Sequence, residues 1–84
     1  MNPSPLEFPR TFPIKAIGKV TDEFETIVTD IIRRHVSELT DFTTRSSAGG
    51  KYLAVTATFV ATSREQLDAL YRELSSNELV LMLL

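Results

Sequence analysis

The sequence predicts an α+β fold in which two helices cover one face of a four-stranded antiparallel sheet. The first observation is that strand-like segments, most of them with hydrophobic residues at alternate positions, surround two segments of helical spacing. The second is the order of these segments, which is strand, helix, strand, strand, helix, strand. The third is size, because 84 residues with 43% hydrophobic and 24% charged residues are typical of one globular domain. We therefore expect a single βαββαβ domain over residues 11–84.

Residues 1–10 are predicted to form an extended arm in front of this domain. The arm is rich in proline, which lacks the backbone donor that a sheet requires. Leu6 and Phe8 are the expected anchors that dock the arm against the domain.

The first strand is predicted over residues 11–19 and the first helix over residues 22–38. One face of the strand carries Phe12, Ile14 and Ala16, and the other carries Lys15 and Ile17. Gly18 is expected to end the strand, where either a positive φ or a close approach of another backbone would be easy. The helix has an apolar stripe made of Phe24, Ile27, Val28, Ile31, Ile32 and His35. Thr21 or Asp22 is the expected helix cap.

The next two strands are predicted over residues 41–46 and 51–61, joined by a flexible turn at residues 47–50. The later strand alternates cleanly and is rich in β-branched and aromatic residues. One of its faces carries Leu53, Val55, Ala57 and Phe59, and the other carries Ala54, Thr56, Thr58 and Val60. The glycines of the turn are those expected in a hairpin.

The second helix is predicted to begin with a capping box between Thr62 and Glu65. Its buried stripe is formed by Leu67, Leu70, Tyr71 and Leu74. Residues 79–84 form the last predicted strand, and this segment is apolar at every position. An ordinary half-exposed strand alternates, so one face of this strand needs additional cover.

Composition excludes several classes of function. Without cysteine the chain has no disulfide, no thiolate nucleophile and no cysteine-bound metal. A net charge of −2 argues against a nucleic-acid binder, which usually has a concentrated basic face. No signal peptide or membrane span is recognised, so a cytoplasmic protein is expected.

The residues with chemical potential are better explained by structure than by catalysis. His35 is the only histidine, and it continues the apolar stripe of the first helix, as a packed or boundary residue does. Asp22, Glu23 and Glu25 lie where a helix dipole favours negative charge. The glycine segments lack the spacing of a phosphate-binding loop. We expect neither an enzyme nor a bound cofactor or metal.

Two parts of the chain resemble a known family. The first is Leu6-Glu7-Phe8-Pro9-Arg10-Thr11-Phe12-Pro13-Ile14-Lys15-Ala16-Ile17-Gly18, and the second is Ser47 with Gly50-Lys51-Tyr52, Val55-Thr56 and Leu70-Tyr71-Arg72-Glu73-Leu74. These segments resemble the YbeD-like family of small bacterial proteins. The resemblance implies a ferredoxin-like fold similar to the ACT regulatory domains of amino-acid metabolism. It implies no activity, because the function of that family is unknown.

The predicted sheet face away from the helices is the candidate interaction surface. We expect it to expose Lys15, Ile17, Thr56, Thr58, Leu81 and Leu83. Such an apolar and hydroxyl-rich face suits pairing with another sheet, although an unoccupied threonine-rich β surface is equally common.

The sequence therefore leads to two functional hypotheses. The first is a non-enzymatic regulatory or adaptor domain that binds another protein, or a second copy of itself as a homodimer, through a sheet edge or the open face. The second is an ACT-like sensor of a small metabolite, with Gly18 and Lys19 as its candidate ligand loop.

Overall fold

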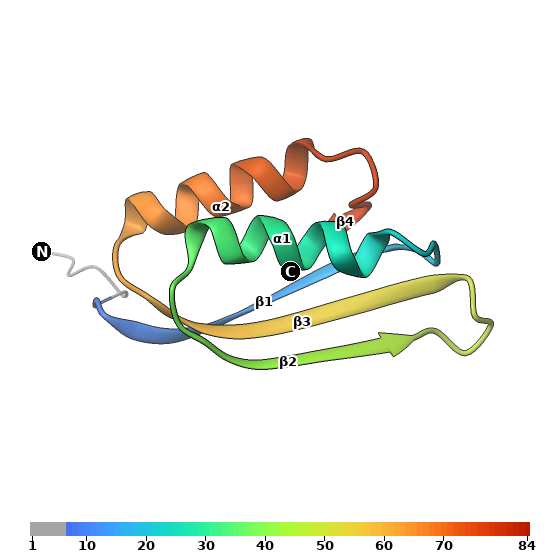
Figure 1. The fold of residues 1–84 in the computed structure, drawn as a ribbon, viewed down its shortest axis with the longest axis horizontal. Helices are drawn as coiled ribbons and strands as arrows, with labels where there is room; N and C mark the ends of the chain where they lie inside the picture. The colour runs from blue at the N-terminus through green and yellow to red at the C-terminus, as the bar shows by residue number, and fades with distance from the viewer. Residues whose placement is uncertain (1–6) are drawn as a thin grey trace, which may run out of the picture.

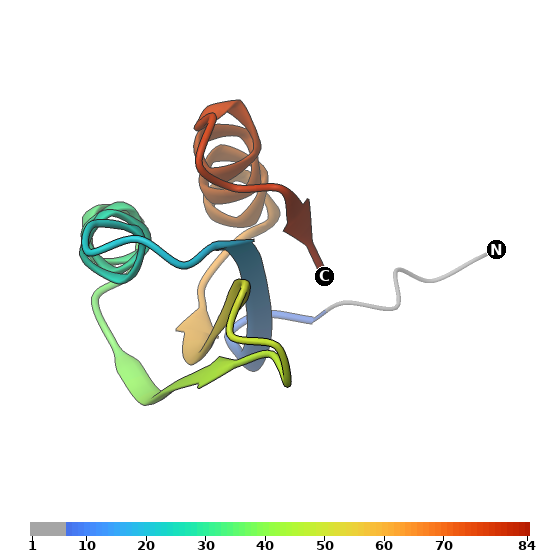
Figure 2. The ribbon, with the colours of Figure 1, turned by 90° about the vertical axis from the view of Figure 1, so that its right-hand side faces the viewer.

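The computed structural model describes residues 7–84 and shows the predicted order of elements. These are β1 (Arg10–Lys19), α1 (Phe24–His35), β2 (Leu39–Ser46), β3 (Tyr52–Ala61), α2 (Arg64–Ser76) and β4 (Met82–Leu83). The strands form one antiparallel sheet in the order β2-β3-β1-β4. Both helices lie on the same side of this sheet (Figures 1 and 2). The predicted α+β, ferredoxin-like fold is confirmed.

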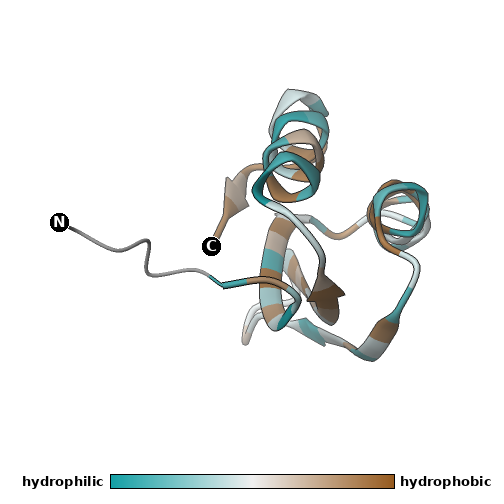
Figure 3. Cartoon of the chain, turned by 90° about the vertical axis from the view of Figure 1, so that its left-hand side faces the viewer, coloured by the Kyte–Doolittle hydropathy of each residue, from teal (hydrophilic) through white to brown (hydrophobic). Residues whose placement is uncertain are grey.

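The core fills the space between the helices and the sheet. Its buried residues are Ile14, Ala16, Phe24, Val28, Ile31, Ile32, Val36, Val55, Ala57, Phe59, Ala61, Leu67, Leu70 and Leu74. The Phe12 ring packs beside them, with centroids 6.1 Å from Phe59 and 6.5 Å from Tyr71. Burial also raises the pKa of the Tyr71 hydroxyl. The apolar sides of the helices turn towards the sheet (Figure 3).

The central pair of strands fixes which residues face the helices. β1 and β3 pair without interruption from Arg10 opposite Ala61 to Lys19 opposite Tyr52. Because side chains alternate along a strand, each pair of opposite residues shares one face of the sheet. The buried pair Ile14 and Ala57 therefore marks the helix-covered face. β2 adds to the outer side of β3, with an irregularity between Leu39 and Asp41.

Helix α1 is shorter than the predicted range of 22–38. The N-cap is Glu23 and not Thr21 or Asp22 as expected, and Glu23 makes no side-chain capping bond. The Thr21 hydroxyl, two residues earlier, accepts from the backbone amide of Phe24 at 3.1 Å. At the other end Val36 is already extended, with φ −128° and ψ 128°. The Gln66 side chain donates to the His35 carbonyl at 2.8 Å and so takes up an acceptor left free at the helix end. This long-range contact at the helix end has no signature in the local sequence.

Helix α2 is capped one residue later than predicted. The N-cap is Ser63, whose hydroxyl accepts from the Gln66 amide at 3.0 Å. The Gln66 side chain in turn accepts a hydrogen bond from the backbone amide of Thr62 at 2.7 Å. The predicted capping box between Thr62 and Glu65 was therefore wrong by one position. A glutamine at the third position after the cap can take the same role as a glutamate, so the pair of Ser63 and Gln66 also fits the capping-box pattern.

The last strand is much shorter than the predicted range of 79–84. The Asn77 side chain accepts from the Leu79 amide at 2.9 Å, and the Asn77 carbonyl accepts from the Val80 amide at 3.0 Å. These bonds hold the chain in a turn, so that only Met82 and Leu83 belong to the strand.

The predicted arm of residues 1–10 is only partly described. Its first six residues, including the Leu6 anchor, lie outside the described residues. Phe8 packs against the core, and Arg10 already belongs to β1. Among residues 7–84, no helix has the length and apolar character needed to cross a membrane.

Candidate functional site

The candidate site is the sheet face that the helices leave uncovered, called here the open face (Figure 2). Strand pairing sets its residues in rows across the sheet. One row is Thr43, Thr56, Lys15 and Leu84; the next is Arg45, Ala54, Ile17 and Met82; a third includes Asp41, Thr58 and Pro13. The structure thus brings together Lys15, Ile17, Thr56 and Thr58, as their alternation predicts.

The last strand contributes different residues to the open face from those predicted. Leu83 lies opposite Ala16, which is 1% exposed, so Leu83 faces the helices and packs against the core. Its assignment to the open face was wrong. Met82 lies opposite Ile17 and therefore shares the open face. Because the segment is apolar throughout, its sequence could not reveal which residues face outwards.

Leu84 lies on the same face as Met82. Lys15 and Leu84 exchange both backbone hydrogen bonds, at 3.1 and 2.9 Å, which places them directly opposite each other. The exposed fractions of Leu81, Met82 and Leu84 are 55, 53 and 62%. These three residues, together with Ile17, are called here the apolar edge. In Figure 3 the brown colour of β4 marks the same segment.

The candidate ligand loop is not a loop in the structure. Gly18 and Lys19 belong to β1, where they pair with Leu53 and Tyr52 of β3. Gly18 is buried, and a Cβ added to it would lie 2.4 Å from both the Leu79 carbonyl oxygen and the Phe24 ring. The expected close backbone approach is therefore present, and packing alone accounts for this glycine.

Two shallow hollows lie on the open face. One, of about 280 Å³, is lined by Lys15, Thr43, Arg45, Ala54 and Thr56. It combines two cations with two hydroxyl groups, a donor set suited to an anion. A neighbouring hollow of about 190 Å³ has a mostly apolar lining that includes Ile17, Tyr52 and Leu53. Sequence reasoning missed Arg45, although its alternation with Thr43 along β2 could have placed it here.

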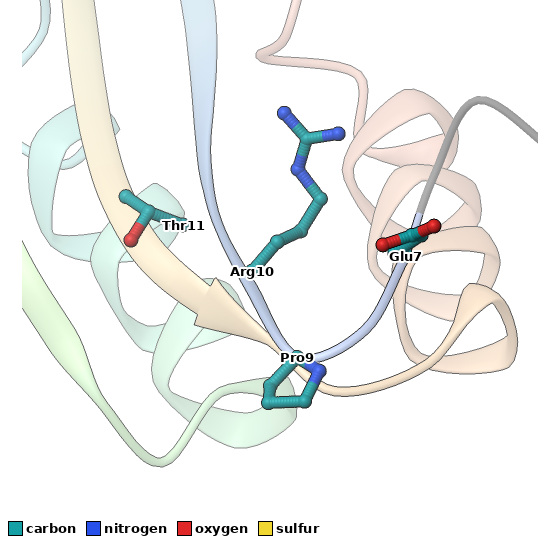
Figure 4. Close-up of a pocket in the computed structure, with 4 residues that line it drawn as sticks. All are labelled: Glu7, Pro9, Arg10 and Thr11. Atoms are coloured by element: carbon teal, nitrogen blue, oxygen red, sulfur yellow. The ribbon is translucent and has the colours of Figure 1, made fainter.

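A further hollow lies where the chain enters β1. It is lined by Glu7, Pro9, Arg10 and Thr11, whose side chains extend in different directions around the bend (Figure 4). Since these groups do not converge on one point, the hollow offers no preformed set of ligands.

His35 forms part of a bridge between the two helices. Its Nε2 atom lies 2.7 Å from Glu73 Oε1, and Arg34 Nη1 lies 2.6 Å from Glu73 Oε2. The hydrogen bonds from His35 and Arg34 hold the pKa of Glu73 below its usual value. His35 is thus the boundary residue that its place in the helical stripe predicts. Within residues 7–84, no three histidine or acidic side chains are grouped as a metal site.

The comparisons with known proteins agree with the fold. The solution structure of protein HP0495 from H. pylori has a TM-score of 0.73 with 12% identity, and covers 99% of this chain and 88% of its own. The C-terminal domain of the MgtC protein from Mycobacterium tuberculosis has a TM-score of 0.74 with 22% identity, and covers 96% and 89%. At these identities the likeness shows the fold alone.

Sequence relatives cover nearly the whole chain. A UPF0250 protein from Paraburkholderia phytofirmans is 47% identical, with 100% of this chain and 97% of the relative covered. A UPF0250 protein from Chromobacterium violaceum is 44% identical, with 94% and 91% covered. A family model described as protein of unknown function, DUF493, matches residues 3–84. The chain therefore belongs to this YbeD-like family of small proteins of unknown function.

Proposed function

We propose that this chain is a non-enzymatic regulatory or adaptor domain that acts by binding another protein through its sheet. The apolar edge carries this proposal, because three large aliphatic side chains there are each more than half exposed. Neighbouring Ile17 extends the patch onto the open face. Clustered exposed apolar groups of this kind favour contact with a protein partner.

The backbone at this edge supports the same proposal. β4 is the outermost strand beside β1, so its outer side can accept a strand from another chain. An added strand would form main-chain hydrogen bonds, while Met82 and Leu84 would supply side-chain contacts on the open face. The partner segment that fits is therefore an extended one with aliphatic residues at alternate positions.

The other polar groups of the described chain support a non-catalytic role. Glu73, His35 and Arg34 already satisfy one another in a helix-to-helix bridge. Lys15 and Arg45 provide positive charge on the open face, but the hollow that they line contains no histidine or carboxylate that could activate its threonine hydroxyl groups.

Replacing Met82 with arginine tests the proposal. We expect Met82→Arg to weaken binding of a natural partner at least about tenfold, because a charge would be placed in an apolar contact. The matched control is Val20→Arg, since Val20 is 48% exposed but lies outside the apolar edge. Binding is measured with proteins enriched from the native bacterium on the wild-type domain, then purified and titrated.

Circular dichroism and melting temperature would establish that both variants fold. Equal loss of binding in Val20→Arg, or undiminished binding by Met82→Arg, would contradict a role for the apolar edge.

A second candidate function is binding of a small anionic metabolite in the hollow lined by Lys15, Thr43, Arg45 and Thr56. A ligand at one hundred times its Kd should add about 2.7 kcal/mol of stability, or roughly 10–20 °C in melting temperature for a small domain. A thermal-shift panel of carboxylates, phosphates and amino acids checks this. A saturable shift that is lost in Lys15→Ala and Arg45→Ala would favour it, and no shift across the panel would count against it.

A further inference from the structure

The edge of the sheet opposite the apolar edge is formed by β2. This strand carries one negative and one positive side chain at equal distances from a central residue. β2 pairs with β3 on one side only, so its other side is a free edge (Figure 1). Asp41 and Arg45 are both exposed and lie on the open face, two residues before and two residues after Thr43. The ion pairs found within residues 7–84 use neither of them.

The direction of the backbone hydrogen-bonding groups along β2 is compatible with a two-fold pairing about Thr43. The Ser47 amide donates to the Tyr52 carbonyl at 2.8 Å, so Ser47 directs its backbone groups towards β3. In an antiparallel ladder this direction alternates from one residue to the next. Arg45, Thr43 and Asp41 therefore also direct their backbone groups towards β3. The intervening residues Phe42 and Thr44 direct their amides and carbonyls outwards, where a further strand could bond to them.

We propose that two copies of this chain pair antiparallel through β2, with Thr43 opposite Thr43 of the second copy. This register places Asp41 of each copy opposite Arg45 of the other, which gives two equivalent ion pairs across a two-fold axis. It also places Phe42 opposite Thr44, and these are the residues whose backbone groups point outwards. The register that pairs the charges is therefore also one that allows the outward-pointing backbone groups to form hydrogen bonds.

The neighbouring antiparallel registers keep the backbone hydrogen bonds but lose the two ion pairs. A shift that makes Phe42 face Phe42 puts Asp41 opposite Thr43 and leaves Arg45 without an acidic neighbour on that strand. A shift that makes Thr44 face Thr44 puts Arg45 opposite Thr43 instead. In-register parallel pairing brings equal charges close together, which is unfavourable. Charged residues on an edge strand usually prevent pairing, but here they select one arrangement.

The irregularity at the start of β2 also fits this register. Regular pairing with β3 begins at Asp41, after the shift between Leu39 and Asp41. The stretch from Asp41 to Arg45 superimposes on itself when the two-fold axis passes through Thr43. Phe42, which is half-buried against the core, would gain cover from the Thr44 methyl group of the second copy.

This inference names a partner for the adaptor role proposed above and rests on its premise that the sheet binds proteins. It uses the opposite edge from Met82 and Leu84, so both contacts can form on one molecule. A β2 dimer has one continuous sheet, with an apolar edge at each end.

Charge reversal provides the test, with self-association measured by sedimentation over a wide range of protein concentration. We expect the wild type to dimerise and both Asp41→Arg and Arg45→Asp to raise the Kd of self-association about tenfold or more, because each turns two attractive contacts into two repulsive ones. An equimolar mixture of the D41R and R45D chains should dimerise again, since opposite charges then meet at both contacts. The double variant D41R/R45D should also recover, by exchanging the two signs.

Asp68→Arg is the matched control, because it makes the same charge change at an exposed position of α2. It should leave the Kd unchanged, and melting temperatures of all variants should show that they fold. A wild type that stays monomeric at the highest concentration, or a D41R and R45D mixture that fails to recover, would overturn the inference. So would a dimer that Met82→Arg dissociates and D41R does not, although that outcome would leave the adaptor proposal standing.

Discussion

At the scale of single residues, Gly18 shows how one position joins three elements. It lies within β1, and the space that a side chain would need is occupied by the Phe24 ring of α1 and by the Leu79 carbonyl before β4. The sequence indicated a close approach at this glycine, but it did not identify the two groups involved. Both follow Gly18 in the sequence, Phe24 six residues later and Leu79 more than sixty residues later.

We expect Gly18→Ala to reduce the free energy of unfolding by about 1–3 kcal/mol, because the added methyl group would overlap backbone and a buried ring. Gly49→Ala is the control, since nothing lies within 4 Å of a Cβ added there. Urea denaturation of both variants measures the difference. Equal stability of the two variants would contradict this expectation, and would show that the buried Phe24 ring and the Leu79 backbone can move to accommodate the added methyl group.

At the scale of elements, the start of α2 depends on one hydroxyl group. Ser63 accepts from the Gln66 amide, whereas Thr62 contributes only its backbone amide, which donates to the Gln66 side chain. We therefore expect Ser63→Ala to cost about 1 kcal/mol of folding free energy and Thr62→Ala much less. Chemical denaturation distinguishes the two variants, and a larger effect at Thr62 would contradict the cap seen here.

The two helices are joined by the bridge from Glu73 to His35 and Arg34. Because hydrogen bonds to these partners lower the pKa of Glu73 in the folded state, the bridge stabilises the fold above the carboxyl's ordinary value near 4.5. This contribution is lost as the pH falls through the lowered value. The wild type should therefore melt above Glu73→Gln at neutral pH, with a difference that disappears under acidic conditions. A difference that does not change with pH would rule out this origin.

At the scale of the whole molecule, the fold could be predicted and the outward-facing residues only in part. Alternation in β1 and β3 placed Lys15, Ile17, Thr56 and Thr58 correctly on one face. The final apolar segment gave no such information, and its register depends on the backbone bonds between Lys15 and Leu84. Periodicity decides a face only where polar and apolar residues differ.

Arrangements across the sheet were also beyond the reach of local patterns. Arg45 of β2 and Lys15 of β1 line the same hollow because only one strand, β3, lies between their strands in the sheet. The bridge between His35 and Glu73 joins residues that are 38 positions apart. Such pairs form when the chain folds, and a single sequence contains no periodic signal for them.

The shortness of β4 has a dynamic consequence for the domain. Its ladder with β1 contains two residue pairs and is extended only by the backbone bonds between Lys15 and Leu84, whereas the ladder between β1 and β3 extends along the full length of both strands. We expect β4 to detach in local openings that leave the rest folded, so the amides of Leu81 and Leu84 should exchange hydrogen at least about tenfold faster than amides in the β1–β3 ladder. Equal protection would show that β4 opens only with global unfolding. Each opening exposes the edge of β1, so an incoming strand could bind by replacing β4 as well as by adding to it.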